Sequence, residues 1–276
     1  MKKRRADEAL FEDMNLESLA LARALIMEGR VMAGDRKILS ASEKLREGDV
    51  LRVRGELDAY VSRGAHKLKK ALEVFPIDLH DRVCVDVGAS TGGFTDVMLR
   101  AGAKRVYAVD VGYNLLDYRL RSDPRVTCME RTNARFLKPG DFDPRPSFGA
   151  TDVSFISLKA VLPAALGVLE GENAAFVALV KPQFEAEKAD VGEKGVVRER
   201  RVHEQVLRDI ATFIPSTGWT LSGMDFSPIR GPEGNIEFLF YLTKRPDPAP
   251  IITENVIDVT ISRAYDKFIK SFKGGL

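Results

Sequence analysis

The chain has 276 residues, 45% of them apolar and 30% charged, and its formal net charge is +2. This length predicts one large domain or a small domain beside a medium one, and the near-neutral charge excludes a surface that is basic throughout. The longest apolar run has about seven residues, whereas a membrane-spanning helix needs about 20. The basic N-terminus is not followed by the apolar core of a signal peptide. We therefore expect a soluble, cytoplasmic protein that makes no membrane contact.

Residues 1–54 form the first predicted unit, with a small α+β pattern. A helix is predicted over residues 16–28, ending at Gly29, because apolar side chains recur there at helical spacing. These side chains are Leu16, Leu19, Ala20, Ala24, Ile26 and Met27. Residues 30–39 read as strand, turn and strand, and residues 48–55 as a further short strand. A unit of this size has a thin core, so we expect it to lean on its neighbour.

The pattern changes after a connector at residues 55–61. A helix over 62–75, with Ser62 as its N-cap, opens an alternation of Val/Ile/Ala-rich strands and helices that continues to residue 214. This alternation predicts a Rossmann-like, mostly parallel sheet covered on both faces, over residues 62–247. Two strands near 218–229 and 235–245 have no helix between them, so they should pair antiparallel at the sheet edge. The tail, 248–276, is predicted to carry a helix from Glu254 to Phe272, with no assigned role.

Cysteine and histidine usage argues against a metal site or a disulfide. Cys84 and Cys128 lie in separate apolar strand-like segments, which favours two buried thiols in a reducing compartment. The chain has two cysteines and three histidines, and they show no metal-ligand spacing. No metal is predicted.

The segment "CVDVGASTGGFTDVMLRAG" reads as strand, glycine loop and helix, and Asp110 ends the next strand, where a carboxylate can accept both hydroxyls of a ribose. The loop departs from the G-x-G-x-x-G dinucleotide fingerprint. A carboxylate at Asp86 would repel a pyrophosphate but favour a sulfonium and an amino group. S-adenosylmethionine therefore fits better than NAD, although NAD, or a glycine turn without a ligand, stays an alternative. Asn133 is either an adenine contact or a simple turn residue.

Four polar residues are expected to meet at one end of the sheet. Asp152 and Lys181 end apolar strands, Glu237 lies inside an apolar strand, and Lys67 borders the buried stripe of the helix over 62–75. That stripe is Leu68, Ala71, Leu72 and Phe75, while Lys69 and Lys70 should point toward solvent. Pro182 should keep Lys181 extended, because the residue before a proline is pushed out of the helical region.

This set suits proton removal from a weakly acidic hydroxyl. A lysine is a base only when neutral; burial and a second cation favour that state, and a carboxylate opposes it. Lys181 is the expected general base, and Asp152 and Glu237 are expected to hold the two lysines in place. The alternative is a pair of lysines whose stems lie on apolar surface while their amines reach water.

These residues resemble a known family. Lys67, Asp152, Lys181 and Glu237 match the K-D-K-E arrangement of FtsJ-like ribose 2'-O-methyltransferases. The stretches "YVSRGAHKL", "DVGASTGGFTD", "ERTNAR", "DVSFISL", "LVKPQFE" and "GPEGNIEFLF" resemble the TlyA (hemolysin A-type) branch. The resemblance implies a class I methyltransferase sheet, S-adenosylmethionine as donor and a cytidine ribose in ribosomal RNA as acceptor. The predicted donor contacts are Asp86, Gly88, Ala89, Ser90, Thr91, Gly92, Gly93, Phe94, Asp110, Asn133 and Asp152.

The resemblance also implies an N-terminal S4 RNA-binding domain, although the usual opening R-L-D reads Arg5-Ala6-Asp7 here. The predicted RNA contacts are Arg4, Arg5, Arg23, Arg30, Arg36, Lys37 and Arg63. Phosphate contacts of this kind give salt-sensitive affinity, whereas the alternative is a solvated charged face. A second basic run at 193–201 either holds RNA over the crevice or is a mobile loop. The ribosome or its RNA is thus the expected partner, and the competing functions are a non-catalytic ribosome-assembly factor and a membrane-lytic protein.

Overall fold

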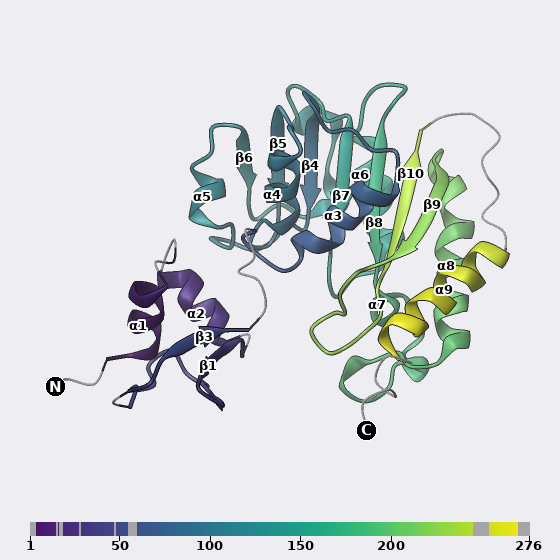
Figure 1. Cartoon of the computed structure of the whole chain (residues 1–276). Helices are drawn as coiled ribbons and strands as arrows, with labels where there is room; N and C mark the ends of the chain where they lie inside the picture. The colour runs from purple at the N-terminus through teal and green to yellow at the C-terminus, as the bar shows by residue number, and fades with distance from the viewer. Residues whose placement is uncertain are drawn as a thin grey trace. The chain divides into compact units, whose positions relative to one another are not determined.

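The computed structural model describes residues 4–14, 16, 19–27, 29–46, 48–54, 60–244 and 254–269. The chain divides into two compact units, residues 1–59 and 60–276 (Figure 1). Among the described residues, no helix is both long enough and apolar enough to cross a bilayer. Cys84 is buried, Cys128 is half-buried, and both are free thiols.

The first unit packs two helices against a three-stranded antiparallel sheet of order β2-β1-β3. Its elements are α1 (Ala6–Asp13), α2 (Leu19–Met27), β1 (Val31–Ala33), β2 (Arg36–Lys37) and β3 (Leu51–Val53). The predicted helix and strands are present, but α1 was missed because its apolar stripe consists only of Ala6, Ala9 and Leu10. Met27 was predicted to share the apolar face of α2, yet it is 84% exposed.

The second unit is built on a seven-stranded sheet of order β6-β5-β4-β7-β8-β10-β9. Its strands are β4 (Val83–Val87), β5 (Arg105–Val109), β6 (Val126–Met129), β7 (Phe148–Thr151), β8 (Ala175–Val180), β9 (Thr220–Phe226) and β10 (Phe238–Thr243). Strands β4 to β8 are parallel, and β10 inserts antiparallel between β8 and β9, which confirms the predicted edge. Strand order reverses between β4 and β7, the place where such folds bind ligands.

Helices cover both faces of this sheet. The elements on one face are α3 (Ala65–Val74), α4 (Gly93–Arg100) and α5 (Tyr118–Arg121), and those on the other are α6 (Leu158–Gly167), α8 (Arg200–Phe213) and α9 (Glu254–Phe268). The short helix α7 (Pro182–Glu185) follows β8, and 3-10 turns span Ala134–Phe136, Pro139–Asp141, Lys188–Asp190, Glu193–Gly195 and Ile214–Thr217. All six residues of β8 are buried, as expected for a central strand with helices on both sides.

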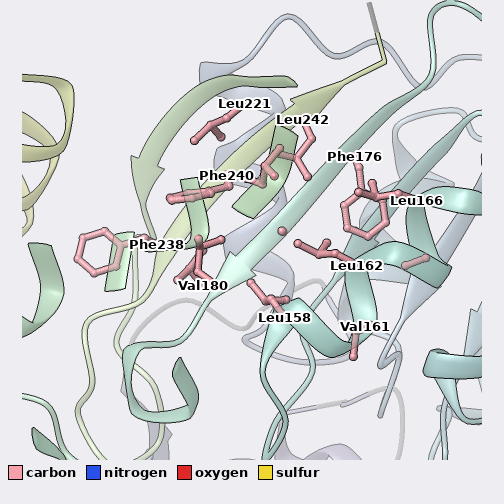
Figure 2. Packing of buried hydrophobic residues seen from close by; sticks show 14 of the residues in the cluster. Leu158, Val161, Leu162, Leu166, Phe176, Val180, Leu221, Phe238, Phe240 and Leu242 are labelled. Atoms are coloured by element: carbon pink, nitrogen blue, oxygen red, sulfur yellow. The ribbon is translucent and has the colours of Figure 1, made fainter. Parts of the chain in front are cut away.

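Figure 2 shows the core beneath α6, where Leu162 and Leu166 lie beside Phe176 of β8. Each fully buried side chain of this kind stabilises the fold by roughly 1.5–3 kcal/mol. The tail helix α9 contributes Ile257, Ile261 and Ala264 to the same cluster. It is therefore part of the core of the second unit rather than an appendage. The helix begins at Glu254 as predicted, and residues 270–272 of its predicted span lie outside the described residues.

One local prediction at the start of the second unit is wrong. The Ser62 side chain does not cap α3: the N-cap is Gly64, which has no side-chain cap, and the N–H of Ala65 donates to the Ser62 carbonyl instead. Ser62 instead fills the space beside Gly93, where an added Cβ atom would lie 2.4 Å from its Oγ atom. The Ser62 hydroxyl thus packs against the first residue of α4.

Candidate active site

Polar residues follow the carboxyl ends of the parallel strands. Asp110 comes directly after β5, Asp152 after β7, and Lys181 after β8. Glu237 was expected inside its strand, but it directly precedes β10. Because β10 runs antiparallel, its first residue, Phe238, pairs with Val180 at the end of β8, so Glu237 reaches the same edge as Lys181.

Lys181 is held at the end of its strand by its backbone and by two side chains. Its φ and ψ angles are −113° and 101°, the extended conformation that Pro182 was predicted to impose. Its Nζ atom lies 2.6 Å from Asp152 Oδ1 and donates a hydrogen bond of 2.8 Å to Ser154 Oγ. The opening of α7 by a proline costs no helical hydrogen bond, because the first N–H of a helix has no partner in it.

The four predicted catalytic residues form one chain of ion pairs. Lys67 Nζ lies 3.1 Å from Asp152 Oδ2 and 2.8 Å from Glu237 Oε2, so Asp152 bridges the two lysines. Both lysines are buried, at 6% and 7% exposure, which excludes the alternative in which their amines reach water. Two ammonium groups and two carboxylates therefore balance one another in a shielded site.

The electrostatics assign different parts to these groups. Burial would lower the pKa of the Lys67 amine, but Asp152 and Glu237 outweigh it, and that pKa lies above its ordinary value. Burial would raise the pKa of Asp152, but Lys67 and Lys181 outweigh it, and that pKa lies below its ordinary value. Lys67 is accordingly a fixed cation and Asp152 a fixed anion of this set.

Two adjoining cavities lie beside this set. The larger, of about 720 Å³, is lined by Asp110, Asn133 and Phe155, among others. The smaller, of about 220 Å³, is lined by Lys67, Asp86, Lys181 and Glu237, among others. Both include Gly88, Ser90, Asp152 and Ser154 in their walls. Ten of the eleven predicted donor contacts line one or both cavities, and Gly92 lines neither.

Asp110 and Asn133 are oriented by backbone N–H groups. Asp110 accepts hydrogen bonds from Ser90 N at 2.8 Å and from Gly112 N at 2.7 Å, which leaves further lone pairs of both oxygens for ribose hydroxyls. Asn133 accepts from Arg135 N at 3.1 Å, as the N-cap of a 3-10 turn. Its amide nitrogen is then the part that can meet an adenine edge.

Asp86 offers the clearest test of whether the site suits a cationic ligand. One of its oxygens accepts from the backbone N of Thr95 at 2.9 Å and from its hydroxyl at 2.7 Å. The other, Oδ1, is buried without a hydrogen-bond partner among the described residues. Burial raises the pKa of Asp86 to about 7, with Asp152 and Asp110 adding to the rise and Thr95 opposing it. An amino group in the smaller cavity would satisfy this oxygen, so the residues fit S-adenosylmethionine.

The glycines of the loop serve packing as well as the ligand. Gly92 has a φ of +97°, and an added Cβ atom would lie 2.3 Å from Leu120. At Gly93 that atom would lie 2.9 Å from the backbone N of Ala65. Glycine is therefore required at these two positions by the protein atoms that fill the space beside them.

Two residues of the site were not predicted, Ser154 and Phe155. Ser154 accepts a hydrogen bond from Lys181, as described above. Phe155 is 91% exposed, has a φ of +62° and lies with its ring centroid 5.1 Å from that of Phe184. The available signal in the sequence was the position of both residues, two and three places after the strand-end carboxylate Asp152.

Most of the predicted RNA-binding arginines of the first unit are engaged in ion pairs. The pairs are Arg4 with Glu12 and Asp13, Arg5 and Arg23 with Asp7, and Arg36 with Glu43 and Asp49. Arg30 donates to the carbonyl of Arg54, while Lys37 and Arg63 are exposed. In the second basic run, Arg201 pairs with Asp190 and Glu199. A role in RNA binding for these residues stays a prediction, on a face more neutral than the sequence suggested.

Fold and site together define an α/β methyltransferase with a lysine–carboxylate centre. The model of the FtsJ-like methyltransferase family matches residues 60–244. The chain belongs to this family, whose methyl donor is S-adenosylmethionine.

Individual relatives extend the similarity beyond the matched region. The chain is 47% identical to YqxC of Bacillus subtilis, provisionally named an rRNA methyltransferase, over 87% of this chain and 86% of that one. It is 48% identical to the 16S/23S rRNA (cytidine-2'-O)-methyltransferase TlyA of Mycobacterium tuberculosis, over 69% and 71%. A solved structure of a hemolysin-like protein from Streptococcus thermophilus is 43% identical, covers 98% of both chains and superposes with a TM-score of 0.78.

Proposed function

We propose that the chain transfers a methyl group from S-adenosylmethionine to the ribose 2'-hydroxyl of a cytidine in ribosomal RNA. The observation that carries this proposal is the buried chain Lys181–Asp152–Lys67–Glu237 beside the donor cavity. The substrate class is supported by the names of the relatives from Mycobacterium tuberculosis and, at 34% identity, Campylobacter jejuni.

The donor would be held by residues of both cavities. Asp110 would accept hydrogen bonds from the ribose hydroxyls of the donor, and Asn133 would contact its adenine. Asp86 Oδ1 would accept a hydrogen bond from the donor's amino group. S-adenosylmethionine supplies an electrophilic methyl group, and its sulfur keeps the electron pair of the bond that breaks. The walls shared by the two cavities would direct that methyl group toward Lys181.

Lys181 would take the proton of the 2'-hydroxyl. An ammonium has three donors; that of Lys181 donates one hydrogen bond to Ser154 Oγ and lies 2.6 Å from Asp152 Oδ1 as an ion pair. The third position is then free for the hydroxyl. After the ammonium loses that third proton to water, the lone pair occupies this position, accepts the proton of the hydroxyl, and leaves the ribose oxygen able to bond to the methyl carbon. General-base help of this kind contributes about 10²–10⁴-fold to a rate.

Lys67 and Phe155 would position other groups of the site and of the substrate without taking part in the reaction themselves. Lys67 stays charged and ties Asp152 to Glu237, so the carboxylate that orients Lys181 has a fixed place. Phe155 offers an exposed ring at the rim of the site, on which an unstacked base can rest. Stacking on an aromatic side chain is worth about 1–3 kcal/mol per base, and a nucleotide must leave its helix before its ribose reaches a recessed amine.

The direct test replaces Lys181 by alanine. Methyl transfer from radiolabelled donor to ribosomal RNA of cells that lack this chain should fall by at least about 10²-fold. Binding of RNA and of donor, measured by calorimetry, should stay nearly unchanged. Lys69→Ala is the matched control, because Lys69 lies on α3 with a half-exposed side chain that pairs with Glu73.

Two outcomes would contradict the proposal. Normal turnover by Lys181→Ala would remove the general-base role. RNA binding without donor binding or methyl transfer by the unaltered protein would instead favour a non-catalytic ribosome-assembly factor.

A further inference from the structure

A cluster of cations lies at the edge of the catalytic set, where the sequence predicted only a solvated lysine and a tail of no known role. We name it the α9 basic surface, and it consists of Lys70, Arg230, Arg263 and Lys267 with the rings of Phe226 and Phe268. The cations come from α3, from the loop after β9, and from the C-terminal half of α9. Lys70 Nζ lies 3.6 Å above the centre of the Phe226 ring, and the guanidinium carbons of Arg263 and Arg230 lie 5.5 Å from Phe226 and 5.3 Å from Phe268.

The charged residues in the two halves of α9 have different neighbours. In its N-terminal half, Glu254 pairs with Arg208 at 2.7 Å and Asp258 with Arg200 at 2.5 Å, so this half is neutralised by α8 (Figure 1). The C-terminal half presents Arg263 and Lys267 beside Lys70, and it also carries the exposed Asp266. Asp225, which is buried, lies 3.2 Å from Lys70 and 3.6 Å from Arg263. The four cations of the surface outnumber the carboxylates Asp225 and Asp266, so its net charge is positive and favours an anion.

The titration of Lys70 reflects the same crowding. Burial lowers its pKa below the ordinary value, and Lys267 and Arg263 lower it further, against the opposing effect of Asp225. Lys70 is also fixed in place, because it donates a hydrogen bond of 2.5 Å to the carbonyl of Phe226. Lys70 is therefore held in place, whereas Arg263 and Lys267 are exposed to solvent.

The α9 basic surface adjoins the catalytic residues. Lys70 lies three residues after Lys67 on α3, on the same side of the helix. Phe226 pairs with Phe238, the neighbour of Glu237, and Ser227 N donates to the carbonyl of Glu237 at 2.8 Å. A nucleic acid that brings a ribose to Lys181 has phosphates within a few ångströms of that ribose on both sides.

We infer that the α9 basic surface binds phosphates of the substrate RNA that flank the methylated nucleotide. This inference rests on the proposed function for the identity of the substrate. Arginine and lysine contacts to phosphate raise affinity without reading sequence and make it depend on salt. A purely structural reading also exists, since cations favour the C-terminal end of a helix and Arg230 bonds to the carbonyl of Phe268 there.

The experiment compares two double variants that lose the same charge. Arg263→Gln with Lys267→Gln removes two of the four cations of the surface, whereas Lys104→Gln with Lys244→Gln removes two exposed lysines at the opposite ends of the strands. The probes are ribosomal subunits from cells that lack this chain, and Kd is measured by fluorescence anisotropy between about 50 and 200 mM salt. We expect the first variant to bind about tenfold more weakly at low salt, with a log–log salt slope lower by about 1.8, and to show raised KM with unchanged kcat and donor affinity.

Equal Kd values and salt slopes for the two double variants would overturn the inference. A lowered Tm with unchanged RNA affinity would assign the surface to stability instead. Lys267→Gln alone keeps the Arg263–Asp225 pair, so it tests the surface if the double variant folds poorly. Should the unaltered protein bind subunits without methylating them, the proposed function fails while the comparison of slopes still decides this inference.

Discussion

Two clusters in this molecule place a carboxylate between two cations, and they differ in one chemical respect. In the first unit, Asp7 is fully buried and accepts from Arg5 at 3.0 Å and from Arg23 at 2.9 Å. In the second, Asp152 lies between Lys67 and Lys181 at similar distances. Arginine keeps its proton in proteins, whereas lysine can give it up. The first arrangement is suited to hold a fold, and the second can also move a proton.

The pKa values of the two carboxylates agree with this contrast. Hydrogen bonds from Arg5 hold the pKa of Asp7 well below its ordinary range, against burial and with help from Arg23. The pKa of Asp152 is lowered in the same direction, although burial opposes it more strongly. Both carboxylates are therefore ionised near neutral pH, and the chemistry depends on the cations around them.

The largest expected effect comes from making the second cluster resemble the first. Lys181→Arg keeps the positive charge next to Asp152 but removes a group that can accept a proton. We expect single-turnover methyl transfer to fall by about 10³-fold while Tm changes little. Turnover within tenfold of the unaltered protein would mean that the lysine only supplies charge. The Asp152 cluster would then not differ in chemistry from the Asp7 cluster.

A loss of stability is expected from Asp7→Asn. This change leaves two arginines beside a neutral amide and should cost about 3 kcal/mol in the free energy of unfolding of the first unit. Because the folded pKa of Asp7 lies below the unfolded value of about 3.9, its contribution is present above that pH and is lost as the pH falls.

Hydrogen exchange by mass spectrometry checks this prediction region by region. Protection should drop in residues 4–54 and stay constant in 60–244. An equal drop in both regions, or none in the first, would show that Asp7 does not act locally on the unit that contains it.

The smallest effect is expected at Asp86, a buried carboxylate that forms no ion pair with any residue that the structure describes. Its folded pKa of about 7 lies above the unfolded value of about 3.9, so the folded chain holds an extra proton and stability falls as the pH rises between these values. Asp86→Asn should therefore raise the free energy of unfolding at pH 8 by on the order of 2 kcal/mol.

The same substitution should weaken donor binding at least about tenfold, because a charge-assisted hydrogen bond to the amino group is lost. Chemical denaturation and calorimetry at pH 5 and pH 8 measure both quantities. A variant that is less stable than the unaltered protein at pH 8, or that binds donor equally well, would contradict this prediction. Asp86 would then not be a carboxylate that lowers stability and binds the amino group of the donor.

The sequence by itself determined the features that depend on near neighbours along the chain. The apolar runs located the strands of the second unit, Pro182 set the extended backbone of Lys181, and Glu254 marked the start of α9. The residue types at the strand ends, together with the resemblance to a family, were enough to name the four residues of the centre. These signals are local because φ/ψ preferences and hydrophobic spacing act over a few residues.

Only the tertiary structure decided which groups meet. The antiparallel insertion of β10 brings Glu237 to Lys67, and packing of α3 against β10 places Lys70, predicted to face solvent, on Phe226 of the neighbouring strand β9. In the first unit, folding pairs arginines that the sequence left as free cations. Such partners are far apart in the chain, and the free energy of an ion pair depends on burial and distance, which no short stretch of sequence contains.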